Sequence, residues 1–448
     1  MKFKLKVLQI LIITLSASSI FSQTISEKID AYVLSYVNTN DFSGCVLATR
    51  NDSILFSECY GKANFSFNIT NTLETKFKIG SISKQFTAAA ILLLEERGLL
   101  NTSDPITKYF PEKSISNNLT IHHLLTHTSG IIDIYDLPDF YAFPCDGVGF
   151  TEIVDMVLEE GPYFEPGQQY LYSNGGYVIL AKIIEDVSGE TYEEYISHSI
   201  FSELGMNSSG SSSKNKVVKN LSVGYDPLGY NNLVQTNDID YLTKGAGSLY
   251  SSPKDLLIWI NSLKERSLLS ETSYQKFFKN YGNAYGYGIS VYKSFGKEVF
   301  GHDGRIAGYI ADYLHYKEDN VNIIITGNIQ TGVADFLRRD IAAIVFNQEY
   351  QTSAKNVPPA TDYPPNVKNI PGAYSFGPSF TVYVEFVDGR LQARANQGAY
   401  SELVPLQDGR FFNRTLYAYI KFEEDKNNTI TKMIWENNDG NSFDGIKK

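Results

Sequence analysis

Residues 80–98 read GSISKQFTAAAILLLEERG, and the interpretation of this 448-residue chain starts from that stretch. Between Ala88 and Leu94 every residue is apolar, so a helix over residues 81–97 would be apolar on all its sides. Such a helix belongs in the middle of a large domain, because no side of it is suited to water. The segment that follows supplies a polar last turn and, at Gly98, a glycine C-cap. The stretch therefore predicts a globular domain built around one buried helix.

Two residues with reactive side chains lie at the start of this helix. Ser81 and Lys84 are three positions apart, so one helical turn places both on the same face. A serine hydroxyl is a weak nucleophile until a base removes its proton, and a partly desolvated lysine can be that base. A helix N-terminus also stabilises developing negative charge. Alone, the S-x-x-K pattern often occurs by chance, so its weight depends on the rest of the chain.

Two later segments carry polar groups that suit the same chemistry. Tyr172 and Asn174 lie in a loop before a helical pattern, where a phenol can transfer a proton and an amide can hold a substrate carbonyl or the lysine. Farther on, His302 and Gly304 belong to the sequence GHDG ahead of a strand-like run. We expect them on an edge strand, where the glycine lets a substrate backbone approach closely. The structural alternative is an ordinary packing tyrosine and ordinary turns.

The remaining periodicity predicts an α+β domain. Helical spacing recurs at 26–38, 151–160, 175–188 and 253–264. Strand-like runs fall at 44–49, 54–60, 286–293, 308–316 and 321–327. Because strands come first, helices in the middle and strands again at the end, we expect a mixed sheet that both ends of the domain complete. This first domain should span residues 23–350.

A second, smaller domain is expected at the C-terminus. Five prolines among polar residues mark 351–371 as an extended linker. Beyond it, at 372–448, the apolar period becomes two, and Asp-Gly pairs at 388–389, 408–409 and 439–440 indicate hairpin turns. A small antiparallel, barrel-like β-domain follows. Since every catalytic candidate precedes residue 306 and such a linker suggests that few contacts join the domains, we predict that deleting 357–448 leaves a soluble first domain.

The N-terminus and the composition restrict location and partners. Residues 1–22 combine three lysines, an apolar run and small residues, which is the pattern of a cleaved secretory signal peptide. No later run is long enough to span a membrane, so we expect a secreted or periplasmic protein. With 43% hydrophobic residues the chain can bury a large core, and a net charge of −11 disfavours nucleic-acid partners. The oligomeric state cannot be predicted.

Three cysteines leave one question open. Cys45 and Cys59 lie on two runs separated by a turn at residues 51–53, and a three-residue loop would place them opposite each other. A cross-strand disulfide and a pair of buried thiols are equally compatible with this. Cys145 has no evident partner, and neither a zinc-type spacing nor a disulfide scaffold is present.

The three polar segments, in this order, resemble the motifs of the penicillin-binding serine hydrolases. This superfamily includes class C β-lactamases, D-alanyl-D-alanine carboxypeptidases, D-aminopeptidases and related esterases. Its motifs S-x-x-K, Y-x-N and K-T-G or H-x-G match Ser81 with Lys84, Tyr172 with Asn174, and His302 with Gly304. The resemblance covers roughly residues 28–350, including IHHLLTHTSG at 121–130 and KGAGSL at 244–249. It implies a β-lactamase/DD-peptidase-like fold, with an antiparallel sheet flanked by helices.

The resemblance also implies a mechanism without a cofactor or metal. Ser81 would attack a carbonyl and form an acyl-enzyme, while Lys84 and Tyr172 share the proton transfers. Asn174, His302 and Gly304 would bind substrate, and the backbone N–H groups of Ser81 and Arg305 would form the oxyanion hole. Tyr172 would be the base when water attacks the ester.

The substrate is less well defined. His302 replaces the lysine of the β-lactamase pattern, and an imidazole attracts a carboxylate less strongly than a fixed ammonium. This favours a peptide, amide or ester substrate of the peptidoglycan type over β-lactams, and Asp303 adds to that preference unless Arg305 compensates. A β-lactamase, or a receptor that binds peptidoglycan fragments without turnover, is the alternative.

Two other chemistries are disfavoured by the sequence. His123 and His127 are four apart and could in principle hold a metal, but no acidic residue takes a metalloprotease position. The G-x-S-x-G pattern of α/β-hydrolases is absent from the sequence.

Overall fold

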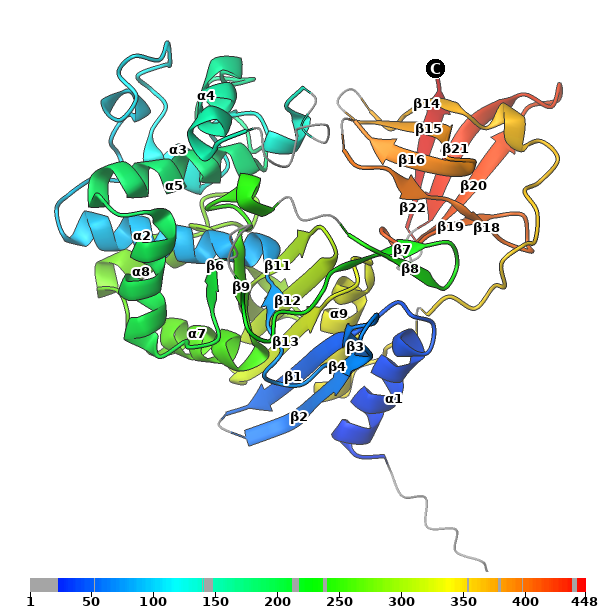
Figure 1. Cartoon of the computed structure of the whole chain (residues 1–448), viewed down its shortest axis with the longest axis horizontal. Coiled ribbons are helices and arrows are strands. Elements are labelled where there is room, and N and C mark those ends of the chain that lie inside the picture. Colours follow the sequence, from blue (N-terminus) through cyan, green and yellow to red (C-terminus); the bar gives the residue numbers. More distant parts are fainter. Residues whose placement is uncertain are drawn as a thin grey trace, which may run out of the picture.

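The computed structural model describes residues 23–448 except 52, 139, 141–147, 212–216, 237–239, 353, 378–379, 397 and 437–440. The predicted signal peptide at 1–22, Cys145 and the predicted turn at 439–440 lie outside the described residues. Figure 1 shows a larger N-terminal part of helices and strands, with a separate β-sheet formed by residues 372–447 beside it. No helix among the described residues has the length and apolar character that crossing a membrane requires.

A six-stranded antiparallel sheet forms the centre of the N-terminal part, in the order β10-β11-β12-β13-β1-β2. Its strands are β1 (Gly44–Arg50), β2 (Ser53–Tyr60), β10 (Ser290–Ser294), β11 (Lys297–Ile306), β12 (Tyr309–Tyr316) and β13 (Val321–Gly327). Strand β13 pairs with β1, so strands from both ends of the domain complete one sheet, as the sequence predicted. The pairing is antiparallel throughout, as the family resemblance implied, and not mixed. Every residue of β12 and β13 is buried, because helices cover both faces.

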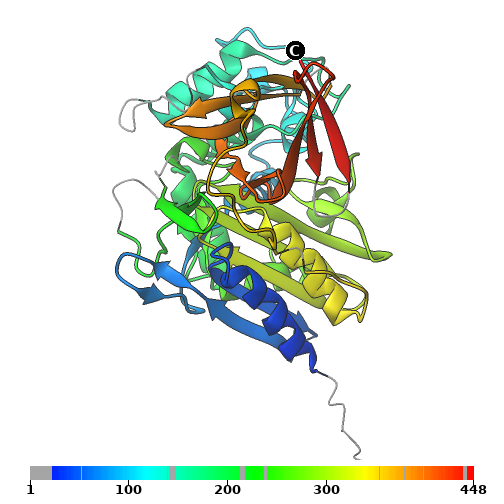
Figure 2. The ribbon, with the colours of Figure 1, turned by 90° about the vertical axis from the view of Figure 1, so that its right-hand side faces the viewer.

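One face of the sheet is covered by two helices from opposite ends of the domain. Helices α1 (Ile25–Val37) and α9 (Val333–Val345) lie side by side in Figure 2, and the Tyr32 hydroxyl on α1 donates to the Asp340 carboxylate on α9. Their apolar sides join the outer residues of the sheet in one core. Helix α9 has no counterpart among the helices predicted from sequence periodicity.

The other face carries the helical layer and the larger core. Helix α2 (Ser83–Glu96) runs through it with eleven of its fourteen residues buried, as its apolar sequence predicted. Around it lie α3 (Ile121–Leu125), α4 (Phe150–Glu160), α5 (Asn174–Ser188), α6 (Tyr192–Ile196), α7 (Pro253–Glu265) and α8 (Glu271–Phe278). Short strands complete the domain: β3 (Lys62–Asn64), β4 (Ile69–Thr70), β5 (Phe77–Lys78), β6 (Gly210–Ser211), β7 (Tyr225–Leu228), β8 (Asn232–Gln235) and β9 (Leu249–Ser251).

The β1–β2 hairpin settles the cysteine question. Its turn is tighter than the predicted three-residue loop, since Arg50 pairs with Ser53, but a bulge between Ala48 and Thr49 shifts the register by one residue. The two differences cancel, so Cys45 faces Cys59 as expected. The two cysteines form a disulfide, with their Cα atoms 4.0 Å apart.

The C-terminal residues form a nine-stranded antiparallel sheet that curves into a barrel-like shape (Figure 1). Its strands are β14 (Gly372–Ser375), β15 (Thr381–Val387), β16 (Arg390–Ala395), β17 (Ser401–Glu402), β18 (Val404–Pro405), β19 (Phe411–Asn413), β20 (Ala418–Glu424), β21 (Ile430–Glu436) and β22 (Ser442–Lys447). Asp388 and Gly389 both adopt positive φ between β15 and β16, which a two-residue hairpin turn requires. The period-two pattern therefore predicted this domain well.

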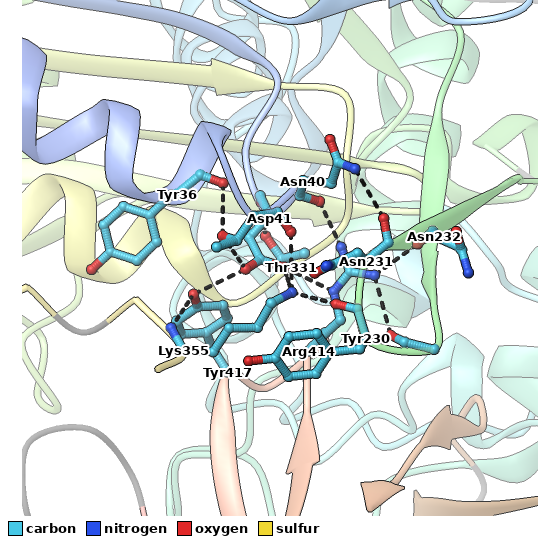
Figure 3. A network of polar contacts seen from close by, with 12 residues as sticks. Tyr36, Asn40, Asp41, Tyr230, Asn231, Asn232, Thr331, Lys355, Arg414 and Tyr417 are labelled. Atoms are coloured by element: carbon cyan, nitrogen blue, oxygen red, sulfur yellow. Dashed lines mark hydrogen bonds and ion pairs between the residues drawn. The ribbon is translucent and has the colours of Figure 1, made fainter. Parts of the chain in front are cut away.

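The expectation that few contacts join the domains is wrong. Arg414, in the β19–β20 turn, reaches into the first domain and pairs with Asp41 at 2.8 Å (Figure 3). Lys355, in the predicted linker, pairs with the same carboxylate at 2.9 Å, and Tyr417 donates to it at 3.1 Å. Asp41 is completely buried, so deletion of 357–448 would remove two of its partners and uncover their surroundings. These contacts join the β-domain and the linker to the first domain.

Candidate active site

Ser81 lies where strand β11 passes closest to the helical layer. It belongs to a 3₁₀ turn, Gly80–Ile82, that leads directly into α2, so the predicted helix start at residue 81 is two residues too early. A Cβ at Gly304 would come within 2.0 Å of the Ile79 carbonyl oxygen and 3.1 Å of the Ser81 nitrogen. A Cβ at Gly80 would lie 2.7 Å from the Arg305 nitrogen. Only glycines permit this approach, which places the backbone nitrogens of Ser81 and Arg305 close together.

Lys84 is buried beneath the half-buried Ser81 and contacts neutral acceptors. Its ammonium donates to Ser81 Oγ at 3.0 Å, to Asn174 Oδ1 at 2.7 Å and to the Ala246 carbonyl at 2.9 Å. Complete burial lowers the pKa of Lys84 to about 7, while the charges of Asp133 and Asp303 oppose the decrease. Since desolvation disfavours the charged form, a substantial fraction of Lys84 is neutral near pH 7 and can accept a proton.

The second motif is fixed by the start of α5. The Ser173 hydroxyl caps this helix by accepting from the Gly176 N–H at 3.1 Å, and Asn174 is its first residue. Asp133 holds Asn174 through both its backbone N–H (3.0 Å) and its side-chain amide (2.8 Å). Because the amide nitrogen is held by Asp133, the amide oxygen points to Lys84. Asp133 was not predicted as a site residue.

Tyr172 lies beside these groups. The Lys84 ammonium is 4.8 Å from the centre of its ring. Burial raises the pKa of Tyr172 well above its ordinary value, and hydrogen bonding with Ser81 only partly opposes the increase. The phenol is therefore neutral at physiological pH and can relay a proton, but it is poorly suited to accumulate as a phenolate.

His302 is hydrogen-bonded through both of its ring nitrogens. Its Nδ1 is 2.5 Å from the Asp303 carbonyl, which can only accept, so Nδ1 carries the proton and Nε2 accepts from the Tyr285 hydroxyl at 2.9 Å. His127 is also hydrogen-bonded through both ring nitrogens. Its Nδ1 accepts from the Ser173 N–H at 3.1 Å, and its Nε2 is 3.3 Å from the Tyr285 hydroxyl. Burial lowers the pKa of both imidazoles. Tyr285 thus links the third motif to the second.

The position of the third motif in the sheet differs from the predicted edge strand. Strand β11 is not an edge strand of the sheet, but β10 pairs only with residues 297–301 of it. Residues 302–306 therefore have a free side toward Ser81, and His302 and Gly304 occupy a local edge. Tyr285 precedes β10 in a segment with two neighbouring Gly-Tyr pairs, a pattern that gave no signal of function.

The Arg305 side chain is bound to other groups, although its charge helps to lower the pKa of the Asp303 carboxyl. Its guanidinium donates to the Asp335 carboxylate on α9 at 2.5 Å and to the Thr415 carbonyl in the β-domain at 3.5 Å. Asp303 is half exposed, and although burial works against it, neighbouring positive charges lower the pKa of its carboxyl. The third motif therefore presents a neutral imidazole next to a carboxylate, and Arg305 offers the site its backbone N–H.

His123 and His127 are held apart by different contacts. His123 Nδ1 caps the start of α3 with Thr120, while His127 lies beyond the end of α3 in a left-handed conformation with φ +57°. The helical spacing that would bring them to one face is thus broken at His127. Groups of metal-ligating side chains are not found among the described residues.

Comparison with known proteins identifies relatives of this chain. Penicillin-binding protein 4* of Bacillus subtilis (strain 168) is 28% identical over 440 residues, covering 91% of this chain and 95% of that protein. A teichoic acid D-alanine hydrolase of Staphylococcus aureus is 26% identical over 313 residues, 68% of this chain and 74% of that protein. The octameric penicillin-binding protein homologue from Pyrococcus abyssi superimposes with a TM-score of 0.64 at 23% identity, covering 94% and 99% of the two chains, which shows a shared fold.

The fold predicted from the sequence motifs is confirmed by these likenesses. A family model identifies the family, because the Beta-lactamase model matches residues 29–348. The chain belongs to the Beta-lactamase family, among relatives of the penicillin-binding proteins.

Proposed function

We propose that this protein is an exported serine hydrolase that forms an acyl-enzyme on Ser81 and acts on D-amino-acid peptides, amides or esters. The observation that carries the proposal is the 3.0 Å contact between Lys84 Nζ and Ser81 Oγ, combined with a pKa of about 7 for Lys84. A base whose pKa lies near the working pH is partly unprotonated at that pH and is still basic enough to accept a proton.

In acylation, neutral Lys84 takes the proton of Ser81 as Oγ bonds to the substrate carbonyl carbon. The negative charge moves to the carbonyl oxygen, which the backbone N–H groups of Ser81 and Arg305 stabilise. The bond to the leaving group then breaks, and the leaving group takes a proton that Lys84 returns through the hydroxyl of Tyr172. Asn174 keeps the lysine in place and is available to a substrate amide.

In deacylation, water loses a proton as it attacks the acyl carbon, and Ser81 regains one when the ester bond breaks. We assign the base to Lys84 and the relay to Tyr172, because burial lowers the pKa of the lysine and raises that of the phenol. This assignment replaces the expectation that Tyr172 is the base.

The substrate class is supported by the charge of the third motif. Burial lowers the pKa of His302, so this position offers a hydrogen-bonding imidazole where a carboxylate-binding site would need a fixed cation. A D-alanyl ester or amide brings no carboxylate to that position. The relative named as a teichoic acid D-alanine hydrolase supports this class.

Export is supported by two observations. The sequence of residues 1–22 has the pattern of a signal peptide, and the Cys45–Cys59 disulfide fits an oxidising compartment.

The test is acylation followed by intact-mass spectrometry. A fluorophosphonate and a p-nitrophenyl butyrate should both add one acyl or phosphonyl group to the wild type, and the butyryl adduct should decay. Ser81→Ala should form no adduct and lose several orders of magnitude of esterase activity, while the exposed Ser267→Ala should behave as wild type. Activity retained in Ser81→Ala would refute the proposal.

A substrate panel separates this function from a β-lactamase or a receptor. We expect a D-alanine p-nitroanilide and p-nitrophenyl butyrate to be turned over with higher kcat/KM than nitrocefin. His302→Lys should raise the nitrocefin value relative to the ester value, because it supplies the fixed positive charge that His302 lacks. If nitrocefin is the better substrate of the wild type, the protein is a β-lactamase, and a permanent adduct with every probe would indicate a receptor.

A further inference from the structure

A cavity of about 560 Å³ lies between the helical layer and the β10 edge of the central sheet. The C-terminal parts of α7 and α8, two successive helices of that layer (Figure 1), contribute Leu263, Lys264 and Phe278. Strands β10, β11 and β12 supply the opposite wall. Among the described residues that line the cavity, none is a catalytic candidate. The volume is in the range of sites that enclose a small molecule.

The floor of the cavity is formed by one row of side chains across three strands. Phe300 on β11 lies opposite Val291 on β10 and opposite His315 on β12. The three side chains therefore share the face of the sheet that is turned to the helices. The ring centres of Phe300 and His315 are 4.7 Å apart, and Phe278 from α8 packs against Phe300 at 5.0 Å. Because aromatic rings pack favourably against one another, this floor suits a flat ring.

His315 contributes an unpaired hydrogen-bond acceptor to this floor. The residue is 2% exposed, and its Nδ1 is 2.7 Å from Asn322 Oδ1, which accepts because the amide nitrogen of Asn322 donates to Thr49. Burial lowers the pKa of His315, so the neutral ring carries its proton on Nδ1 and a lone pair on Nε2. In the part of the chain that the structure describes, Nε2 has no hydrogen-bond partner and is not one of the unpaired atoms that are completely enclosed. Its lone pair is therefore accessible to a donor inside the cavity.

The neighbouring row of the sheet carries charge. Lys293 on β10 lies opposite Glu298 on β11, but the Glu298 carboxylate is 2.8 Å from the ammonium of Lys317. Glu298 is the single acidic side chain among the described residues of the lining, and neither Lys293 nor Lys264 has an ion pair among the described residues. In a chain with a net charge of −11, this cavity thus has an excess of positive charge and suits an anion.

The distance between acceptor and cation indicates the length of the ligand. His315 and Lys293 are two strands apart across the sheet and two residues apart along it, which places their Cα atoms about 12 Å from each other. Both side chains start from the same face of the sheet. A ring with a polar group at each end is therefore better suited to the cavity than a small inorganic anion.

We propose that this cavity binds a planar aromatic carboxylate with a hydroxyl group at the opposite end. Its ring lies on Phe300, its hydroxyl donates to His315 Nε2, and its carboxylate contacts the Lys293 ammonium. Such a ligand contains no ester or amide bond, so its binding does not depend on hydrolysis at Ser81.

The experiment is isothermal titration calorimetry of the full chain near neutral pH with 4-hydroxycinnamate and two analogues. We expect one saturable site per chain for 4-hydroxycinnamate. Cinnamate lacks the hydroxyl donor and leaves Nε2 unpaired, so it should bind about tenfold more weakly. The alcohol 4-hydroxycinnamyl alcohol lacks the carboxylate and should bind about fivefold more weakly.

Two variants assign the contacts. Lys293→Gln should weaken 4-hydroxycinnamate binding about fivefold and leave the affinity for the alcohol unchanged. In His315→Phe, the affinities for 4-hydroxycinnamate and cinnamate should become equal, because the acceptor is gone while a ring remains. If His315→Phe does not fold, the difference between the two ligands in the wild type tests the acceptor.

The control is Lys297→Gln. Lys297 begins β11, does not line the cavity and lies over the ring of Phe346 at the end of α9, on the other face of the sheet. Its replacement should leave the 4-hydroxycinnamate affinity unchanged. Equal weakening by Lys293→Gln and Lys297→Gln would reduce the effect to general charge and overturn the proposal. Absence of saturable 1:1 binding, equal affinities of 4-hydroxycinnamate and cinnamate in the wild type, or an unchanged difference between them in folded His315→Phe would overturn it as well.

Discussion

Two of the buried lysines, Lys84 and Lys355, differ in one respect of their surroundings. Lys84 lies under Ser81 and donates to a hydroxyl, an amide oxygen and a carbonyl. Lys355 lies between the domains and donates to the carboxylate of Asp41 at 2.9 Å and to the carbonyls of Thr39 and Tyr230. Burial lowers the pKa of both, to about 7 for Lys84 and about 8 for Lys355, where Asp41 opposes the decrease.

The difference explains how one residue type serves two purposes. At Lys355 a buried carboxylate touches the ammonium, so the charged pair is held together and joins linker to domain. At Lys84 the carboxylate that raises the pKa most is Asp133. It hydrogen-bonds to Asn174, and Asn174 in turn contacts the ammonium. The lysine without a direct carboxylate can release its proton, and the paired lysine is structural.

The largest effect should come from exchanging each lysine for arginine. Lys84→Arg keeps a cation but replaces a group of pKa about 7 by one that stays protonated, so kcat/KM for p-nitrophenyl butyrate should fall by about 10³-fold or more. Lys355→Arg keeps the pair with Asp41 and should retain wild-type kcat/KM. Comparable losses in the two variants would mean that the difference between the lysines is not functional.

The next effect concerns stability. Asp41→Asn leaves Lys355 and Arg414 as buried cations without their shared carboxylate, so the free energy of unfolding should fall by about 3–5 kcal/mol in urea denaturation. Glu298→Gln breaks the exposed pair with Lys317 at 2.8 Å and should cost less than about 1 kcal/mol. A similar small cost for both variants would show that the contact between the domains is weak.

The pH dependence of kcat/KM should reflect the titration of Lys84 and not that of Lys355. Because the lowered pKa leaves Lys84 protonated below about 7, kcat/KM should rise with pH through that value and level off above it. Esterase measurements between pH 5.5 and 9, corrected for spontaneous hydrolysis, give the apparent pKa of the free enzyme. Lys355→Arg should show the same curve, and a curve that rises instead near pH 8 in wild type but not in this variant would assign the titration to Lys355.

The sequence predicted the parts of the site that carry fixed spacing, and it missed those that depend on the fold. Ser81, Lys84, Tyr172 and Asn174 come together because short motifs sit at the starts of α2 and α5. Asp133 was missed because it lies 41 residues before Asn174 in a segment without periodicity. Its position directly after the apolar pair Ile131-Ile132 was the one available sign.

The same limit applies to larger distances along the chain. Asp41 and Arg414 are 373 residues apart, and each looks like an ordinary surface residue in its own segment. The proline-rich composition of 351–371 predicts an extended linker, but composition says nothing of which side chains this segment buries. Lys355 is 6% exposed, and only the packing of both domains shows why.

The smallest expected effect concerns Asp133, the carboxylate that raises the pKa of Lys84 while hydrogen-bonded to Asn174. Asp133 raises the pKa of Lys84 more than Asp303 does, so Asp133→Asn should move the apparent pKa of kcat/KM below that of wild type, and Asp303→Asn should move it less in the same direction. Asparagine keeps an oxygen that can accept from Asn174, so a change in kcat/KM above the titration should stay small compared with Lys84→Arg. The measurement is the pH profile of the three proteins at one ionic strength, because screening weakens such shifts. A larger shift in Asp303→Asn would show that the third motif, rather than the Asp133–Asn174 contact, sets the basicity of Lys84. An upward shift in Asp133→Asn would contradict the electrostatic explanation altogether, since removal of a negative charge can only favour the neutral lysine.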